Sequence, residues 1–198
     1  MTRLVLASAS TTRARLLTNA GVVFDAVAAP LDEFAARESL SRDGVPSDEI
    51  AVSLAELKAL RVSALRPGAF VIGADQILIL EGEIVSRSSG IEEARALLRR
   101  LAGQNHELIT AAALAKEGAI VWRHVARAEM QMREISEAFL EAYLETQGEA
   151  VLGSVGCYHL EGVGAQLFAK TTGDYFAILG LPLLPLLGAL RELGALET

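Results

Sequence analysis

The chain has 198 residues, of which 52% are hydrophobic, and its formal net charge is −7 at pH 7. This hydrophobic content suffices for one sizeable core or two small ones, and the negative charge argues against binding to nucleic acid or to anionic membranes. Its one cysteine, Cys157, excludes an internal disulfide and a cysteine zinc cluster, and fits a reducing cytoplasm. The N-terminal apolar stretch is too short for a signal peptide, and the longest apolar run, residues 175–190, is shorter than the ~20 residues of a membrane-spanning helix.

A short strand at residues 4–6 and a helix at residues 13–20 are predicted on either side of the hydroxyl-rich turn ASASTT. The N-terminus of a helix offers free N–H groups and a positive dipole, and Arg13 adds a formal charge, so the turn indicates an anion site such as a phosphate site. Simple capping of the helix by Ser10 or Thr11 explains the same residues. Both interpretations remain open at this point.

The next part of the chain is predicted to contain one strand and one long helix. The strand spans residues 22–28, and the loop that follows it at residues 30–34 carries adjacent acids, whereas residues 37–45 are polar and expected to be exposed. The helix spans residues 48–65, with Ser47 as its cap and an apolar face formed by Ile50, Leu54, Leu57 and Leu65. Lys58 lies on this helix, and the pattern alone favours a surface lysine.

The segment AFVIGADQILILEGEIVSR, residues 69–87, predicts a buried hairpin with a carboxylate inside it. Apolar residues flank Asp75 and Gln76, a tight turn follows at residues 81–83, and the second strand leads to Arg87. Because an unpaired buried carboxylate is costly, Asp75 is expected to contact a cation, hydrogen-bond donors or a solvent-filled cleft. Two interpretations remain: a carboxylate that binds metal or activates water, and a buried aspartate satisfied by backbone donors.

The C-terminal half alternates between helical and strand patterns. Three helices are predicted here. The first begins at a capping box at residues 89–92, the second begins after Ser136 as its cap, and the third begins at the sequence Gly180-Leu181-Pro182. Predicted strands span residues 107–115, 119–134, 166–170 and 175–179, with an irregular glycine-spaced segment at residues 152–161. This mixture predicts an α/β or α+β fold with a mixed sheet.

The usual short catalytic motifs do not occur in this sequence. There is no HExxH, GxSxG, Walker lysine or GxGxxG motif, and His106, His124 and His159 are isolated. Cys157 has no local support as a nucleophile, and a small buried thiol is the favoured interpretation.

Taken together, a series of segments resembles the Maf family of nucleoside triphosphate pyrophosphatases, also called septum-formation-inhibitor-like proteins. The segments are LVLASAS, LDE, ELKA, VIGADQILILEGEIVSR, LRRLAGQNHELIT, GCYHLEGVGA and GDYFAILGLPLLPLL. The resemblance implies one domain over residues 1–198 with an α/β (mixed α+β) fold, in which an elongated mixed sheet is flanked by helices and two lobes enclose a cleft without a linker. It also implies cleavage of a nucleoside triphosphate to the monophosphate and pyrophosphate, and a homodimer.

The resemblance also assigns roles to individual residues. It implies that Asp75, Glu33 and Lys58 are the catalytic residues, with Asp75 as the proton acceptor. It also implies that Glu33 and Asp75 hold a divalent metal such as Mg²⁺ or Mn²⁺. The residues that it implies for phosphate binding are Ser8, Ser10, Arg13, Lys58 and Arg87. Two positions depart from the family pattern: Thr11-Thr12 replaces a proline-arginine pair, and Arg87 replaces a lysine, which keeps the charge and changes its geometry.

Two further positions bear on the choice of base. Gln76 and Glu161 resemble the branch of the family that acts on 7-methyl-GTP more than the pyrimidine-type branch, although LEG stands here in place of the usual SEG. A carboxylate suits guanine because it can accept hydrogen bonds from N1 and N2. Alternatives are a dTTP or UTP pyrophosphatase, a nucleotide-binding regulator of septum formation with weak turnover, and a phosphomonoesterase that would release orthophosphate.

Overall fold

The computed structural model describes residues 3–197, which divide into two compact units. Within the described residues, the first unit comprises residues 3–76, 110–126 and 175–197, and the second comprises residues 77–109 and 127–174. The strands are β1 (Leu4–Leu6), β2 (Asp25–Ala26), β3 (Phe70–Leu80), β4 (Glu83–Val85), β5 (Asn105–Lys116), β6 (Ala119–Met132) and β7 (Phe168–Thr171). The helices are α1 (Thr11–Asn19), α2 (Glu33–Arg42), α3 (Ser47–Ser63), α4 (Ile91–Leu101), α5 (Glu137–Gln147), α6 (Tyr175–Ile178) and α7 (Leu183–Glu192), with short 3₁₀ segments at Gly148–Gly153 and Val163–Leu167.

The described strands form a seven-stranded mixed sheet, as the sequence predicts. Its order is β2-β1-β3-β5-β6-β7, and β4 pairs with β3. β1 runs parallel to β2 and β3, whereas β3 with β4 and β6 with β7 are antiparallel pairs. Of the helices in the described part of the chain, none is both long and apolar enough to cross a membrane.

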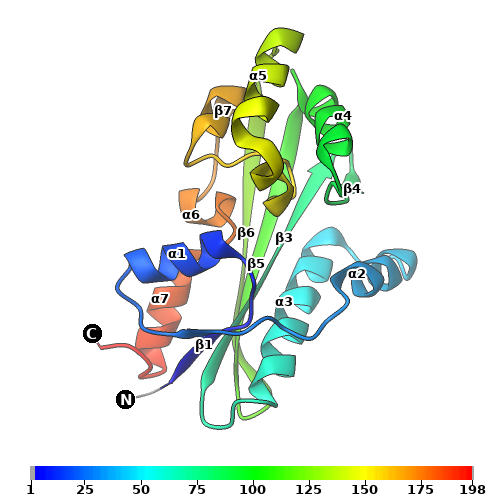
Figure 1. The fold of residues 1–198 in the computed structure, drawn as a ribbon. Coiled ribbons are helices and arrows are strands. Elements are labelled where there is room, and N and C mark those ends of the chain that lie inside the picture. Colours follow the sequence, from blue (N-terminus) through cyan, green and yellow to red (C-terminus); the bar gives the residue numbers. More distant parts are fainter. Residues whose placement is uncertain (1–2, 198) are drawn as a thin grey trace. The chain divides into compact units, whose positions relative to one another are not determined.

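In the first unit, helices pack on both faces of the sheet (Figure 1). Alternate residues of β3 point to opposite faces, so Phe70 and Ile72 pack with α1 and α7, whereas Val71 packs with α3. Gly73 permits the close approach of α3, because a Cβ atom there would lie 2.1 Å from the carbonyl oxygen of Ala55. The centre of β3 is therefore enclosed by helices on both sides.

Two predictions for the first unit are wrong near α2. The predicted strand at residues 22–28 is reduced to the two residues of β2, and the predicted loop at residues 30–34 runs into the helix α2. The expected exposure of residues 37–45 is confirmed, since none of them is buried. Asp32 caps α2, because its Oδ1 accepts a hydrogen bond from the Ala35 N–H at 2.9 Å. No residue of α2 is fully buried, so the sequence carries no periodic apolar face that would have indicated a helix.

The predicted strand at residues 175–179 is also wrong, because residues 175–178 form the helix α6. The apolar run YFAIL suits a buried strand and a buried helix equally. What distinguishes them here is a set of hydrogen bonds to the last carbonyl groups of α6 from Gln76 and Thr110, which lie far away in the sequence.

Three predicted helix caps have different outcomes. Ser136 caps α5, since its Oγ accepts from the Phe139 N–H, as predicted. Ser47 is instead the first residue of α3, after Pro46. The predicted capping box is wrong, because Gly90 is the N-cap of α4 and Ser89 bonds to Glu93.

In the second unit, the predicted hairpin of β3 and β4 is confirmed. Its two turn residues, Glu81 and Gly82, have φ angles of 54° and 83°, which suit a two-residue turn that matches the twist of the strands. Register pairs Leu78 with Val85, so the chain leaves β4 towards Arg87 as the sequence predicts.

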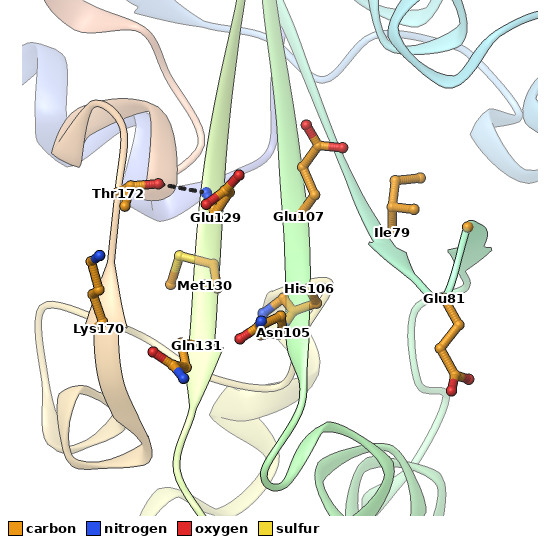
Figure 2. A pocket seen from close by; sticks show the side chains of 11 residues that line it. Ile79, Glu81, Asn105, His106, Glu107, Glu129, Met130, Gln131, Lys170 and Thr172 are labelled. Carbon is orange, nitrogen blue, oxygen red and sulfur yellow. Dashed lines mark hydrogen bonds between the residues drawn. The ribbon is translucent and has the colours of Figure 1, made fainter.

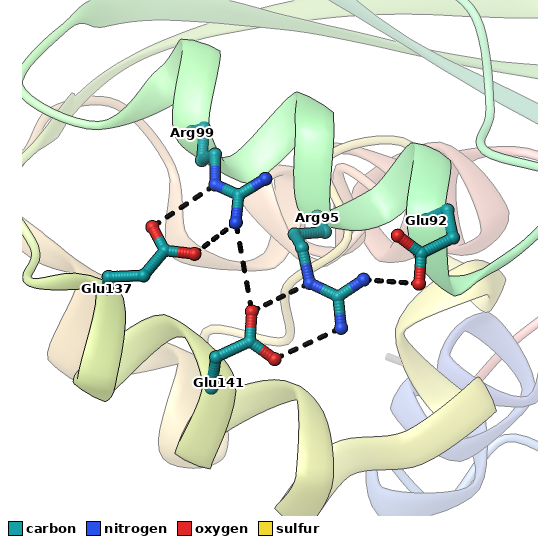
Figure 3. Close-up of polar contacts among 5 residues, drawn as sticks. All are labelled: Glu92, Arg95, Arg99, Glu137 and Glu141. Carbon is teal, nitrogen blue, oxygen red and sulfur yellow. Dashed lines mark hydrogen bonds and ion pairs between the residues drawn. The ribbon is translucent and has the colours of Figure 1, made fainter.

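An ion-pair network joins α4 to α5 within the second unit (Figure 3). Arg95 binds Glu141 through two parallel hydrogen bonds of 2.7 and 3.0 Å and also contacts Glu92. Arg99 binds Glu137, and the side-chain hydrogen bond and charge of Arg99 lower the pKa of that carboxyl. These groups lie at the surface, where ion pairs contribute little to stability, so their main effect is to fix the alignment of the two helices.

His106 makes the stability of the second unit depend on pH. It is 4% exposed, its Nε2 lies 2.7 Å from the Tyr158 hydroxyl, and burial lowers its pKa from 6.5 to about 4. Between these values the unfolded chain binds a proton that the folded chain does not, so stability is complete above pH 6.5 and falls as the pH drops towards 4. We expect this one group to account for a loss of roughly 3 kcal/mol in the free energy of unfolding.

The measurement is urea denaturation of the wild type and His106→Gln between pH 7 and pH 4.5. The variant should be less stable at pH 7 and should lose less stability on acidification than the wild type. His124→Gln, at a half-buried site, is the matched control and should retain the wild-type slope. An unchanged slope in His106→Gln would show that other groups cause the acid sensitivity.

Candidate active site

Lys58 of α3 and Asp75 of β3 form a buried ion pair, in which Nζ and Oδ1 are 2.7 Å apart. The two side chains are only 3% and 1% exposed. Lys58 Nζ also lies 2.9 Å from Oε2 of Glu33, at the start of α2, whose side chain is 42% exposed. The structure thus brings together the three residues to which the resemblance assigns catalysis, and the expectation of a surface lysine is wrong.

Asp75 keeps one oxygen atom available. Oδ1 accepts from Lys58, whereas the buried Oδ2 has no hydrogen-bond partner among the described residues. A buried oxygen of a carboxylate is costly to leave unsatisfied, so it marks a position where a water molecule or a cation is favoured. The interpretation of a structural aspartate satisfied by backbone donors does not fit, because the partner of Asp75 is a buried lysine.

The turn between β1 and α1 holds Ser8, Ser10 and Arg13 in one hydrogen-bonded group. Ser10 caps α1 by accepting from the Arg13 N–H, as one of the two interpretations predicts, and its own N–H donates to Ser8 Oγ at 3.1 Å. Arg13 is 5% exposed and donates through Nε to the carbonyl oxygen of Gly180 at 2.8 Å and through Nη1 to Ser8 Oγ at 3.3 Å. The guanidinium is therefore fixed in place at the N-terminus of a helix.

Sheet topology places the segments that carry these groups at the same end of the parallel strands. β1 is parallel to β2 and β3, with Leu6 paired to both Ala26 and Ile72. The chain leaves β1 towards Ser8, leaves β2 towards Glu33, and continues along β3 to Asp75, all in the same direction. The carboxyl ends of parallel strands are the usual position of ligand sites in α/β sheets.

Gln76, which the resemblance assigns to base specificity, follows Asp75 but points to the opposite face of the sheet. Its Nε2 donates to Thr110 Oγ1 at 2.9 Å and to the carbonyl oxygens of Ala177 and Ile178 at 3.0 Å each. No local sequence pattern indicates this contact with α6 or the contact between Arg13 and Gly180.

Arg87 belongs to the second unit, where it is exposed after β4. It lines an open pocket of about 380 Å³ together with Arg100 of α4. Nothing in a helical pattern distinguishes Arg100 from other surface arginines, so its place beside Arg87 is not predictable from the sequence.

Glu161, also in the second unit, is exposed at the end of an ordered loop. The loop is held at Cys157, whose carbonyl oxygen accepts from the Tyr143 hydroxyl at 3.1 Å and whose Sγ lies 3.3 Å from Ser88 Oγ. Cys157 is buried, as predicted, and burial raises the pKa of its thiol, which disfavours the nucleophilic thiolate.

Glu33 and Asp75, to which the resemblance assigns a divalent metal, are both held by Lys58. Residues 3–197 contain no cluster of three or more His, Cys, Asp or Glu side chains that could form a complete metal cage. Glu33 and Asp75 nevertheless converge on Lys58, and Oδ2 of Asp75 is available. Mg²⁺ commonly uses one or two carboxylates and completes its shell with phosphate oxygens and water.

A larger hollow of about 570 Å³ lies in the second unit, over the strands shown in Figure 2. Glu81, Glu107, Glu129 and Lys170 are among its lining residues, and Arg127 donates to Glu107 at 2.8 Å. The described residues that line this hollow include none of the site residues predicted from the sequence.

Comparison with known proteins agrees with this arrangement. The chain is 49% identical over 196 residues to a nucleoside triphosphate pyrophosphatase of Caulobacter vibrioides, covering 99% of this chain and 98% of the relative. It is 46% identical over 195 residues to a 7-methyl-GTP pyrophosphatase of Rhizobium etli, covering 98% of both. The profile of the family described as Maf-like protein matches residues 3–193. The resemblance inferred from the motifs is thereby confirmed, and the chain belongs to the Maf-like protein family.

Proposed function

We propose that this protein hydrolyses a nucleoside triphosphate to the monophosphate and pyrophosphate, and so removes modified nucleotides from the cell. The observation that carries the proposal is the buried Lys58–Asp75 pair with one oxygen of Asp75 left available. The names of the relatives from Caulobacter vibrioides and Rhizobium etli support the same reaction.

In the proposed mechanism, Asp75 is the general base. Lys58 holds Oδ1, so Oδ2 is the atom that accepts a proton from the attacking water. The strand fixes the carboxylate on one side and α3 fixes the lysine on the other, which orients the base before substrate binds. Exclusion of water from this buried pair strengthens its electrostatic effect on a developing charge.

Cationic side chains bind the phosphates in this mechanism. Arg13 offers a guanidinium fixed by Gly180 and Ser8, and the N-terminus of α1 adds free N–H groups. Lys58 neutralises charge close to the base. Arg87 is assigned the same role on the strength of the family resemblance.

A divalent metal ion, Mg²⁺ or Mn²⁺, would be held by Glu33 and Asp75. When bound, it supplies charge neutralisation on the triphosphate and on the leaving pyrophosphate. Lys58 pairs with both of these carboxylates, at 2.9 Å from Glu33 and 2.7 Å from Asp75.

We propose 7-methyl-GTP, or another modified purine triphosphate, as the preferred substrate. Glu161 supports this choice, because a carboxylate only accepts hydrogen bonds and so matches the donors of guanine rather than a pyrimidine carbonyl. A mismatched polar group costs about 1–3 kcal/mol, so kcat/KM for 7-methyl-GTP should exceed that for UTP by roughly tenfold to a hundredfold.

The preference is measured as the ratio of kcat/KM for 7-methyl-GTP to that for UTP. Glu161→Gln should reduce the ratio, because an amide both donates and accepts. Glu149→Gln, another exposed glutamate of the second unit, is the matched control and should keep it. A wild-type preference for dTTP or UTP would place the protein functionally in the pyrimidine branch.

The reaction itself is tested by assaying pyrophosphate release over a panel of normal and methylated triphosphates. We expect release with Mg²⁺ and loss of release after EDTA treatment, restored by added metal. Orthophosphate as the product would support a phosphomonoesterase. Nucleotide binding without turnover of any triphosphate would support the regulator of septum formation.

Two further properties belong to this proposal. The family resemblance supports a homodimer, and the single buried Cys157 is compatible with a cytoplasmic protein.

A further inference from the structure

The amide nitrogen of Gln76 is fully engaged by other parts of the first unit. Its two protons are shared among three acceptors at 2.9–3.0 Å: Thr110 Oγ1 and the carbonyl oxygens of Ala177 and Ile178. An amide nitrogen has only two N–H donors, so none remains for a ligand. A direct contact between this nitrogen and a nucleotide base would require breaking contacts that the fold already uses.

The two carbonyl acceptors, of Ala177 and Ile178, lie at the C-terminal end of α6. The last carbonyl groups of a helix lack partners within the helix and need donors from elsewhere. Gln76 supplies them, and the Thr110 hydroxyl adds a bond of 2.9 Å to the Ala177 oxygen. The end of α6 is therefore fixed by two side chains from the central strands β3 and β5.

α6 leads directly to Gly180, which contacts Arg13. The Gly180 N–H bonds to the Ala177 oxygen at 2.8 Å, and its own oxygen accepts from Arg13 Nε at 2.8 Å. Gly180 has a φ of 102°, and a Cβ atom there would lie 3.6 Å from Arg13 Nε and 3.9 Å from Gln76 Oε1. Gln76 and Arg13 thus both lie within 4 Å of the Cβ position of the same glycine.

We infer that Gln76 is a positioning residue that holds Arg13 in its phosphate-binding orientation through the end of α6 and Gly180. The inference rests on the proposed role of Arg13 in binding the triphosphate. It differs from the prediction that Gln76 selects the base, and the two roles have different consequences. A positioning residue affects the binding of any polyphosphate, whereas a base-selecting residue affects only ligands that carry a base.

Inorganic tripolyphosphate separates the two roles because it has no base. Its Kd is measured by calorimetry in the presence of Mg²⁺ for the wild type, Gln76→Ala, Arg13→Ala and the double variant. We expect Arg13→Ala to weaken binding roughly 10- to 100-fold, as loss of a charge-assisted contact does. Gln76→Ala should weaken it about 5- to 20-fold alone and less than about twofold in the Arg13→Ala background, because residues that act through one another are not additive.

Two more variants distinguish a loss of positioning from a general loss of folding. Thr110→Val keeps the volume of the side chain and removes one bond to α6, so it should weaken tripolyphosphate binding about two- to fivefold, again only when Arg13 is present. Gln131→Ala, at an exposed position of β6, is the control and should bind as the wild type does. The kcat/KM values for 7-methyl-GTP and UTP should fall by the same factor in Gln76→Ala, mainly through KM.

Three results would overturn the inference. Unchanged tripolyphosphate binding in Gln76→Ala, with an altered ratio of the two substrates, would make Gln76 a base-selecting residue. Equal losses with and without Arg13 would show that the two residues act independently. The inference would also lose its basis if tripolyphosphate did not bind the wild type, or if it bound Arg13→Ala as tightly as the wild type. Because binding needs no turnover, an inactive enzyme with the expected coupling would contradict the proposed function alone.

Discussion

Replacing Asp75 by asparagine should reduce the rate of pyrophosphate release about 100-fold or more, as loss of a general base does. The amide has nearly the same shape as the carboxylate but cannot accept the proton of the attacking water. The side chain of residue 75 is enclosed between β3 and α3, so we expect the substitution to leave the backbone in place. The measurement is kcat at saturating triphosphate and Mg²⁺.

Two controls accompany this variant. Asp43→Asn, at an exposed position after α2, should retain wild-type activity. Thermal denaturation should show that the Asp75→Asn protein is folded at the assay temperature. A folded Asp75→Asn enzyme with most of its activity would show that another group accepts the proton.

Replacing Lys58 by methionine should lower the free energy of unfolding by about 3–5 kcal/mol, the usual cost of removing one partner from a buried ion pair. The methionine fills much of the space of the lysine stem but leaves Asp75, which is 1% exposed, without its cation. Turnover should also fall, since the charge beside the base is lost. Urea denaturation at pH 7 measures the first effect.

The cause of this loss can be separated from a loss of packing. If the uncompensated carboxylate is responsible, the double variant Lys58→Met, Asp75→Asn should be more stable than Lys58→Met alone, because the buried charge is gone. Lys116→Met, on a half-buried side chain of the same unit, is the control and should cost less. A double variant that is no more stable than Lys58→Met would attribute the loss to packing.

Local sequence patterns predicted the chemistry of Asp75 better than that of its partner. A carboxylate within an apolar strand must have a counterpart, and the structure supplies it as Lys58 at 2.7 Å. Lys58 itself lies on a helix whose pattern is compatible with exposure, so only the family resemblance identified it. The pairing depends on how α3 packs over Gly73, which no local pattern contains.

The wrong prediction for α6 and the unpredicted contact of Arg13 both originate in contacts between distant residues. α6 was predicted as a strand because its apolar sequence fits both states, and the donors that favour the helical end come from Gln76 and Thr110. The contact between Arg13 and Gly180 spans 167 positions in the sequence. α2 was missed for a different reason: it is exposed, and its cap at Asp32 resembles an ordinary acidic loop.

In the proposed mechanism, Asp75 and Lys58 serve the cleavage of a triphosphate into a monophosphate and pyrophosphate. ³¹P NMR of 7-methyl-GTP incubated with the enzyme and Mg²⁺ tests it most directly, because it identifies every phosphorus product at once. We predict equal amounts of monophosphate and pyrophosphate with the wild type, and only a small fraction of that amount with a folded Asp75→Asn variant over the same time. Orthophosphate with a diphosphate as the first products, or equal rates for the wild type and Asp75→Asn, would contradict the account.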